Sequence, residues 1–180
     1  MNKEKIEKDS TVTLLKCICE NEKIATIRLV GGAVIDLLEG RVPKDYDLMC
    51  WYTDDREKLV KHLNQFGFIF MYETATSKTY AKGKVKIQFL KTNLGGFDFT
   101  ISTATYDLYK GDIEIDEECF EKKILIPTSF DDKKAALNSL SRLPHWIKKG
   151  YRIKNATYFS LLNCLNDSSI TNIQRYPFQS

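Results

Sequence analysis

The sequence contains no apolar run near the roughly 20 residues that a membrane-spanning helix needs. Its start, MNKEKIEKDS, is charged and lacks the apolar stretch of a secretory signal. The G-x-G-x-x-G turn of dinucleotide-binding folds is also absent. We therefore expect a cytoplasmic protein without a membrane partner and without a dinucleotide-binding fold.

Side chains that bind structural metals are few. None of the five cysteines forms a C-x-x-C pair, and the two histidines, His62 and His145, stand far apart in the chain. This pattern predicts that the protein has no structural zinc site. With nine glycines, four prolines and no repeats, the sequence also offers no flexible linker.

The 180 residues are 43% hydrophobic, which suits one domain with a small appendage. The net charge of +3 conceals an asymmetry. From Lys133 to the end, eight Lys and Arg residues face Asp167 alone, a net charge of +7, so the first 132 residues carry −4. This distribution suits a body that binds cations and a basic end that binds a polyanion, or simply a solvated basic helix face.

Hydrophobic spacing and turn residues predict the elements. The predicted elements are helices from Asp9 or Ser10, over 33–39 and over 54–67, strands over 27–30, 45–52, 68–76, 84–92 and 97–109, and helices from about 131 with a break at Pro144. Their order predicts an α+β fold, a mixed β-sheet palm with flanking helices and a short C-terminal helical extension. We expect two domains, a head at 1–130 and a basic helical extension at 131–180.

The most informative segment is LVGGAVIDLLEGRVPKDYDLM, residues 29–49. A strand ends there at Gly31-Gly32 and a helix begins at once, so free backbone N–H groups and the positive helix end point past the strand. Such a turn predicts an anion site, with phosphate as the expected anion.

Thirteen residues after Gly32 comes Asp45-Tyr46-Asp47, at the start of a strand. Because strand side chains alternate, Asp45 and Asp47 project from the same face and repel each other unless a cation lies between them. Mg²⁺ prefers one or two carboxylates together with substrate phosphates. A phosphate turn beside this pair predicts metal-assisted phosphoryl or nucleotidyl transfer.

This segment resembles the head motif of the class II tRNA nucleotidyltransferase and poly(A) polymerase family, within the polymerase-beta-like nucleotidyltransferase superfamily. The family pattern, GGxVRDxLLG, a spacer and DxD, corresponds here to GGAVIDLLEG, RVPK and DYD. A second segment, FDFTISTATYD at 97–107, resembles the family's RRDFTINALAYD. The resemblance covers roughly residues 27–116.

The resemblance implies a nucleotidyltransferase that moves an NMP from an NTP such as ATP to a hydroxyl acceptor, with an RNA (tRNA) 3′ end as the expected acceptor, and releases pyrophosphate. It implies two Mg²⁺ ions, or Mn²⁺, held by Asp45, Asp47 and Asp98, although Asp98 could instead contact the nucleotide ribose. The residues expected to bind the nucleotide are Gly31, Gly32, Asp36, Arg41 and Lys44.

Basic and aromatic residues alternate near the C-terminal end, a pattern that suits single-stranded RNA. The candidates for RNA contact there are Arg142, Lys148, Lys149 and Arg152, with Trp146 and Tyr151 between them. An amphipathic helix that docks Trp146 onto the head explains the same pattern. The aromatic residues expected in the core are Trp51, Tyr52, Phe66, Phe68, Phe70 and Tyr72.

The sequence also departs from the family pattern at several positions. The family's Arg before the motif Asp is Ile35 here, and Arg41 and Lys44 could compensate. Where the superfamily often has a third carboxylate on a strand, KVKIQFL offers only Gln88. About 50 residues follow Asp131, too few for the family's base-selecting body. Two alternatives therefore stay open: a degenerate head that binds nucleotide or RNA without turnover, and an enzyme that transfers NMP to a protein or small molecule, as toxins do.

Overall fold

The computed structural model describes residues 3–91, 97–129 and 133–166. The chain forms two compact units. The first contains the described residues up to Lys91 together with Ser102–Ile115, and the second contains Phe97–Ile101 and the described residues from Asp116 onward. The two predicted domains, a catalytic head at 1–130 and a basic extension at 131–180, were assigned by their expected functions. The contact units do not test these functions, so the domain assignment stays a prediction.

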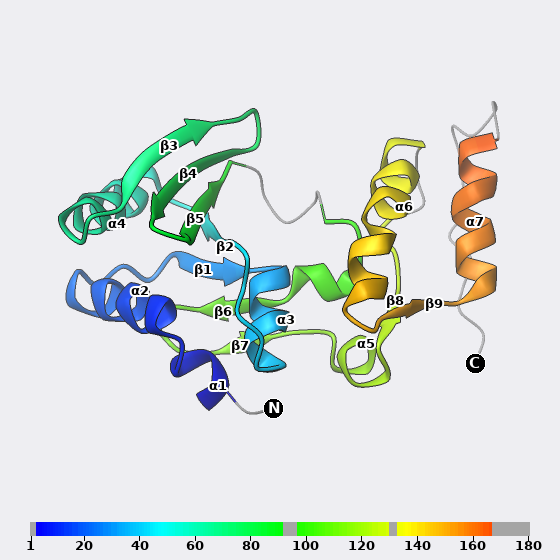
Figure 1. Cartoon of the computed structure of the whole chain (residues 1–180), viewed down its shortest axis with the longest axis horizontal. Coiled ribbons are helices and arrows are strands. Elements are labelled where there is room, and N and C mark those ends of the chain that lie inside the picture. Colours follow the sequence, from blue (N-terminus) through cyan, green and yellow to red (C-terminus); the bar gives the residue numbers. More distant parts are fainter. Residues whose placement is uncertain (1–2, 92–96, 130–132, 167–180) are drawn as a thin grey trace. The chain divides into compact units, whose positions relative to one another are not determined.

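A seven-stranded mixed sheet organises the first unit, in the order β3-β4-β5-β2-β1-β6-β7 (Figure 1). Its central strand β2 pairs antiparallel with β1 and parallel with β5. The strands are β1 (Ile27–Val30), β2 (Tyr46–Cys50), β3 (Ile69–Glu73), β4 (Ser77–Lys82), β5 (Val85–Leu90), β6 (Thr105–Asp107) and β7 (Ile113–Glu114). Together with its helices, the sheet confirms the predicted α+β fold.

The described residues of the first unit form four α-helices: α1 (Glu4–Glu7), α2 (Ser10–Asn21), α3 (Gly32–Leu38) and α4 (Thr53–Gln65). The predicted cap of α2 is confirmed, because the Asp9 carboxylate accepts hydrogen bonds of 3.0 Å from the backbone N–H groups of Thr11 and Val12. The apolar positions of this helix, Val12, Leu15 and Cys19, are buried as the spacing predicts.

One face of the sheet packs on helices. Leu29 is the register partner of both Leu48 and Tyr106, and all three are buried. The Tyr46 hydroxyl, on the same face, donates to Asp9 Oδ2 at 2.9 Å and so ties the sheet to the start of α2. Because side chains alternate along a strand, Asp47 and its neighbours on β1 and β5 lie on the opposite face.

The second unit is mainly helical. It contains α5 (Glu117–Lys122), β8 (Ile124–Leu125), α6 (Lys133–Lys148), β9 (Arg152–Ile153) and α7 (Asn155–Asn166), and η2 (Thr100–Thr103) crosses the boundary between the units. The predicted break at Pro144 is wrong, since α6 continues through it. A proline removes one helical hydrogen bond, and here burial of Ala136, Leu143 and Trp146 along one side of α6 outweighs that loss.

Two other predictions need correction, and one strand was not predicted. Of the aromatic residues expected in the core, only Phe68 is buried, whereas the other five are exposed. The predicted strand over 97–109 is a strand only at β6, and β4 was not predicted because its sequence, SKTYAK, has no run of apolar residues. None of the described helices is long and apolar enough to cross a membrane.

Candidate functional site

The glycine turn lies where β1 passes into α3. Gly31 has φ +72°, a backbone conformation that glycine adopts without steric cost. Its N–H donates to the Ala104 carbonyl at 2.8 Å, so this amide is used within the fold. In the first turn of α3, which begins at Gly32, the N–H groups of Val34 and Ile35 donate to the Gly31 carbonyl at 3.2 and 3.5 Å, whereas those of Gly32 and Ala33 come before the first acceptor of the helix. Gly32 is therefore the better placed of the two glycines for an anion.

The carboxylate pair lies at the same end of the sheet as this turn. Val30 and Asp47 are register partners on the antiparallel strands β1 and β2. Gly31 and Gly32 directly follow Val30, and Asp45 lies two residues before Asp47. Because β1 and β2 run antiparallel, the structure brings the two predicted motifs together. The roles of these residues stay predictions.

Asp45 shows the most informative local geometry. Its Oδ1 atom is buried and has no hydrogen-bond partner among the residues that the structure describes. Lys86 Nζ on β5 lies 4.0 Å from that oxygen. Lys86 lies two residues before Gln88, which is the register partner of Asp47, so the Asp45 carboxylate reaches the sheet face that Asp47 occupies. A buried carboxylate oxygen without a donor is unfavourable, and a cation would satisfy it.

A row of polar side chains crosses the sheet from Asp47. Gln88 is its partner on β5, and Thr79 on β4 is the partner of Gln88. Thr79 is fully buried, and within the described part of the chain its hydroxyl has no hydrogen-bond partner. The sequence places Gln88 at the position of a third carboxylate, but it did not predict that Lys86 and Thr79 lie at this site. The alternation of KVKIQFL places Lys86 and Gln88 on one face, and this signal could have found Lys86.

Asp36 and Arg41 hold the loop that leads to the carboxylate pair. Gly40 ends the helix region with φ +76°, and the Arg41 N–H then donates to the Asp36 carbonyl at 2.7 Å. The Arg41 guanidinium lies 2.8 Å from Asp36 Oδ1 and also pairs with Glu39. Arg41 is thus largely compensated by these two carboxylates, whereas Lys44 is exposed beside Asp45.

Asp98 belongs to the second unit, where its carboxylate is buried. Its Oδ2 atom accepts a hydrogen bond of 3.1 Å from Trp146 Nε1 and lies 3.6 Å from Arg142 Nε. Its backbone carbonyl accepts a hydrogen bond of 3.0 Å from the Ser139 hydroxyl. These contacts anchor Asp98 to α6, and a role as third metal ligand stays a prediction.

The basic residues predicted to contact RNA lie on α6 and just beyond it. Arg142, Lys148 and Arg152 are exposed. Lys149 Nζ lies over the Trp146 ring, 5.1 Å from its centroid. Trp146 and Tyr151 are buried and pack edge to face with ring centroids 5.3 Å apart, so these two rings are not available to stack on bases. Contact of the four basic residues with RNA stays a prediction.

The donors present fit one divalent cation of the hard type. In residues 3–91, 97–129 and 133–166, no group of three or more His, Cys, Asp and Glu side chains is placed to hold a metal ion. Asp45 and Asp47 supply two carboxylates, and the unpartnered Asp45 oxygen is the kind of atom that a cation satisfies. Mg²⁺ commonly binds through one or two carboxylates and completes its shell with water and phosphate oxygens.

Comparison with solved structures identifies the fold. A CCA-adding enzyme of Thermotoga maritima in complex with tRNA is 18% identical with a TM-score of 0.65, over 88% of this chain and 43% of that one. A CCA-adding enzyme in complex with CTP is 18% identical with a TM-score of 0.67, over 88% and 42%. This chain has the fold of part of these enzymes.

A tRNA nucleotidyltransferase in complex with a primer tRNA and an incoming ATP analogue is 18% identical, with a TM-score of 0.63, over 84% of this chain and 50% of that one. The chain therefore spans half or less of the length of these three enzymes. No protein-family model matches the chain, and no curated protein does. The predicted structural resemblance is confirmed at the level of the fold.

Proposed function

We propose that this protein is a divalent-metal-dependent nucleotidyltransferase of the cytoplasm that transfers an NMP from an NTP to an RNA 3′ hydroxyl. The main support is the pair Asp45 and Asp47 beside the glycine turn, where Asp45 Oδ1 is buried and accepts no hydrogen bond from any described residue. The second support is the fold, which it shares with part of enzymes that were solved with tRNA and with nucleotides.

In this reaction the acceptor oxygen bonds to the α-phosphorus, and the bond between that phosphorus and the oxygen bridging to the β-phosphate breaks. Pyrophosphate leaves, and the hydroxyl proton passes to solvent. Asp45 and Asp47 would hold Mg²⁺ or Mn²⁺, which supplies positive charge to the phosphate oxygens and lowers the pKa of the hydroxyl. The Gly32 amide and the exposed Lys44 would bind the phosphates from the protein side.

Asp98 would act as a positioning residue in this proposal. Its carboxylate is held by Trp146 and lies beside Arg142, so it fixes the start of the FDFT segment against α6. Asp36 would act similarly on the first motif, because it holds Arg41 and thereby the loop before Lys44.

A second candidate function is a module that binds nucleotide or RNA without turnover. The observation in its favour is Gln88, a neutral amide beside Asp47 where a carboxylate would strengthen cation binding. The ion pairs of Arg41 with Asp36 and Glu39 also favour a binding module. They neutralise a positive charge that could otherwise bind the triphosphate.

Identification of the acceptor tests the proposal. The purified protein is incubated with Mg²⁺, total RNA and each NTP labelled in its α-phosphate, and the products are treated with ribonuclease or protease. The proposal expects label that is sensitive to ribonuclease, with release of pyrophosphate. Label on protein or on a small molecule would contradict the RNA acceptor. Binding of NTP with no transfer to any acceptor would favour the binding module.

A further inference from the structure

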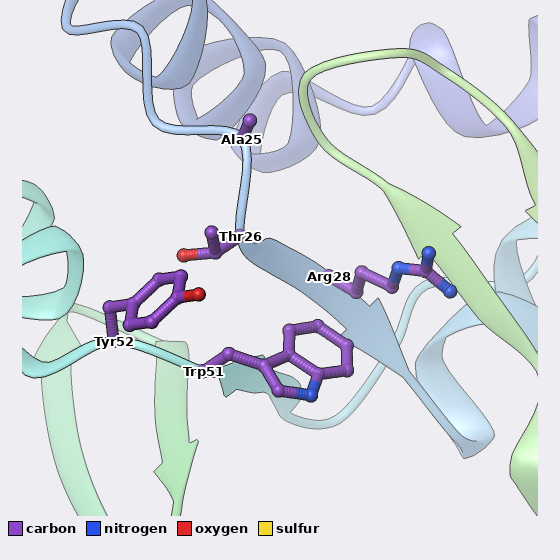
Figure 2. A pocket seen from close by; sticks show the side chains of 5 residues that line it. All are labelled: Ala25, Thr26, Arg28, Trp51 and Tyr52. Carbon is purple, nitrogen blue, oxygen red and sulfur yellow. The ribbon is translucent and has the colours of Figure 1, made fainter.

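A pocket of about 270 Å³ lies in the first unit, at the end of β1 and β2 away from Asp45. Its lining residues are Ala25, Thr26, Arg28, Trp51 and Tyr52 (Figure 2). The Trp51 side chain is 49% exposed and that of Tyr52 is 65% exposed. Large aromatic side chains left open in a concave site contribute little to the core and are typical of ligand sites. The volume suits one planar ring rather than a whole nucleotide.

Two polar groups of this pocket, the Arg28 guanidinium and the Thr26 hydroxyl, are already paired. Arg28 Nη1 lies 2.8 Å from Glu114 Oε2, and Arg28 Nε lies 3.8 Å from Asp107 Oδ2. The Thr26 hydroxyl donates to Asp55 Oδ2 at 2.5 Å. Because the positive charge of Arg28 is compensated, the pocket does not favour a phosphate or another anion.

What the pocket does offer is aromatic surface. Arg28 Cζ lies 5.4 Å from the centroid of the Trp51 ring, a cation–π distance that steadies the indole. Figure 2 shows that the side chains of Trp51 and Tyr52 point in different directions, and that the Arg28 side chain lies beside the indole of Trp51. A neutral planar heterocycle that stacks on the exposed ring face is the ligand class that matches these groups.

The pocket shares a sheet face with the carboxylate pair. Arg28 and Met49 are register partners, and Met49 lies two residues after Asp47, so these side chains project from one face. Contact of the Trp51 ring with Arg28 places the ring on that face as well. Trp51 lies four positions after Asp47, about 13 Å along the strand. A few nucleotides of an extended strand span such a distance.

We propose that the pocket lined by Arg28, Trp51 and Tyr52 binds an unpaired base of the RNA acceptor, a few nucleotides from the 3′ end that Asp45 and Asp47 act on. This rests on the proposed function for the identity of the strand. Base stacking at Trp51 tolerates any sequence, since every base has a π-face. The pocket would therefore hold and align the acceptor without selecting it.

Binding without metal or NTP tests this inference independently of catalysis. The chain has two tryptophans, of which Trp146 is buried, so quenching of tryptophan emission by a single-stranded RNA decamer reports on Trp51. Anisotropy of a fluorescently labelled decamer gives the affinity. We expect saturable quenching, and we expect Trp51→Leu to weaken binding about tenfold, within the range for loss of one stacked base. Phe66→Leu, which removes another exposed aromatic ring, should leave the affinity unchanged.

The same titration separates the alternatives. If Trp51→Leu bound the decamer as tightly as the wild type does, the inference would be overturned. If the wild type bound AMP or CMP as tightly as the decamer, the pocket would be assigned to a free nucleotide instead. The doubly substituted Asp45→Asn/Asp47→Asn protein should still quench its tryptophan emission saturably on binding the decamer, even though its transfer of label would fall at least a hundredfold. Decamer binding thus tests the pocket, and label transfer tests the proposed function.

Discussion

The indole N–H of Trp146 donates a hydrogen bond of 3.1 Å to the Asp98 carboxylate, and both side chains are buried in the second unit. The two residues are 48 positions apart in the chain. A buried carboxylate is costly unless donors satisfy it, so this bond joins the FDFT segment to α6.

Replacement of Trp146 by Phe should lower the free energy of unfolding by about 2 kcal/mol, because it removes a donor from a buried charged acceptor. Urea unfolding followed by circular dichroism measures the effect. Trp51→Phe is the matched control and should change stability little, since Trp51 is half exposed. Equal stability of the two variants would contradict the role given to the Trp146 bond.

Asp98→Asn separates an anchoring role from a metal-binding role. We expect reduced stability, because the amide is a weaker acceptor for Trp146 and removes the charge beside Arg142. Binding of Mn²⁺, followed by electron paramagnetic resonance of the free ion, should stay within about twofold of the wild type. A loss of Mn²⁺ affinity with unchanged stability would show instead that Asp98 is a metal ligand.

Gln88→Glu should strengthen binding of a divalent cation. The new carboxylate would lie beside Asp47 on the parallel neighbouring strand, where it repels Asp47 without metal and attracts the cation with it. We expect Mn²⁺ affinity to rise about tenfold and metal-free stability to fall. Gln65→Glu, at the exposed end of α4, adds the same charge elsewhere and should have neither effect. Equal changes in both variants would mean that Gln88 is not near the cation.

The contact of α1 with the sheet should weaken in acid. The pKa of Glu7 is lowered from 4.5, chiefly by the hydrogen bond from Lys16 Nζ at 2.8 Å, and Tyr106 also donates to it. A group with a lowered folded pKa contributes stability above its unfolded pKa and loses it as the pH falls through the folded value. Between pH 5 and 3 the wild-type melting temperature should therefore fall more than that of Glu7→Gln. Parallel curves for the two proteins would contradict this.

The cysteines should differ sharply in reactivity. Cys17 is exposed, whereas burial raises the pKa of Cys19 to about 12 and that of Cys119 to about 11. Labelling of the native protein by a chromogenic disulfide reagent at pH 8 should show a fast phase that Cys17→Ser abolishes and Cys19→Ser retains. A fast phase that persists in Cys17→Ser would show that the partly buried Cys50 or one of the buried thiols is accessible.

Local patterns predicted much of the first unit. The cap at Asp9 and the limits of β1 followed from single residues and short spacings, because these elements depend on hydrogen bonds and alternation within a few positions. The adjacency of the glycine turn and Asp45 was also implied locally, since one short helix and a tight loop separate them.

Other features depend on pairings distant in sequence. The place of Gln88 beside Asp47 requires the parallel register of β5 on β2, and the partner of Asp98 comes from α6. Trp51 and Tyr52 were predicted to be core because aromatic residues usually are, but the end of the sheet leaves them in an open pocket. The hydrophobicity of an aromatic residue does not by itself show whether its ring is buried in the core or exposed to a ligand.

The central claim is that Asp45 and Asp47 support transfer of a nucleotide, and single-turnover transfer from an α-labelled NTP to an RNA 3′ end tests it most directly. The account predicts Mg²⁺-dependent transfer by the wild type and by Asp54→Asn, which removes an exposed carboxylate of α4, and a loss of at least a hundredfold in Asp45→Asn/Asp47→Asn. Transfer by the doubly substituted protein at the wild-type rate would contradict it.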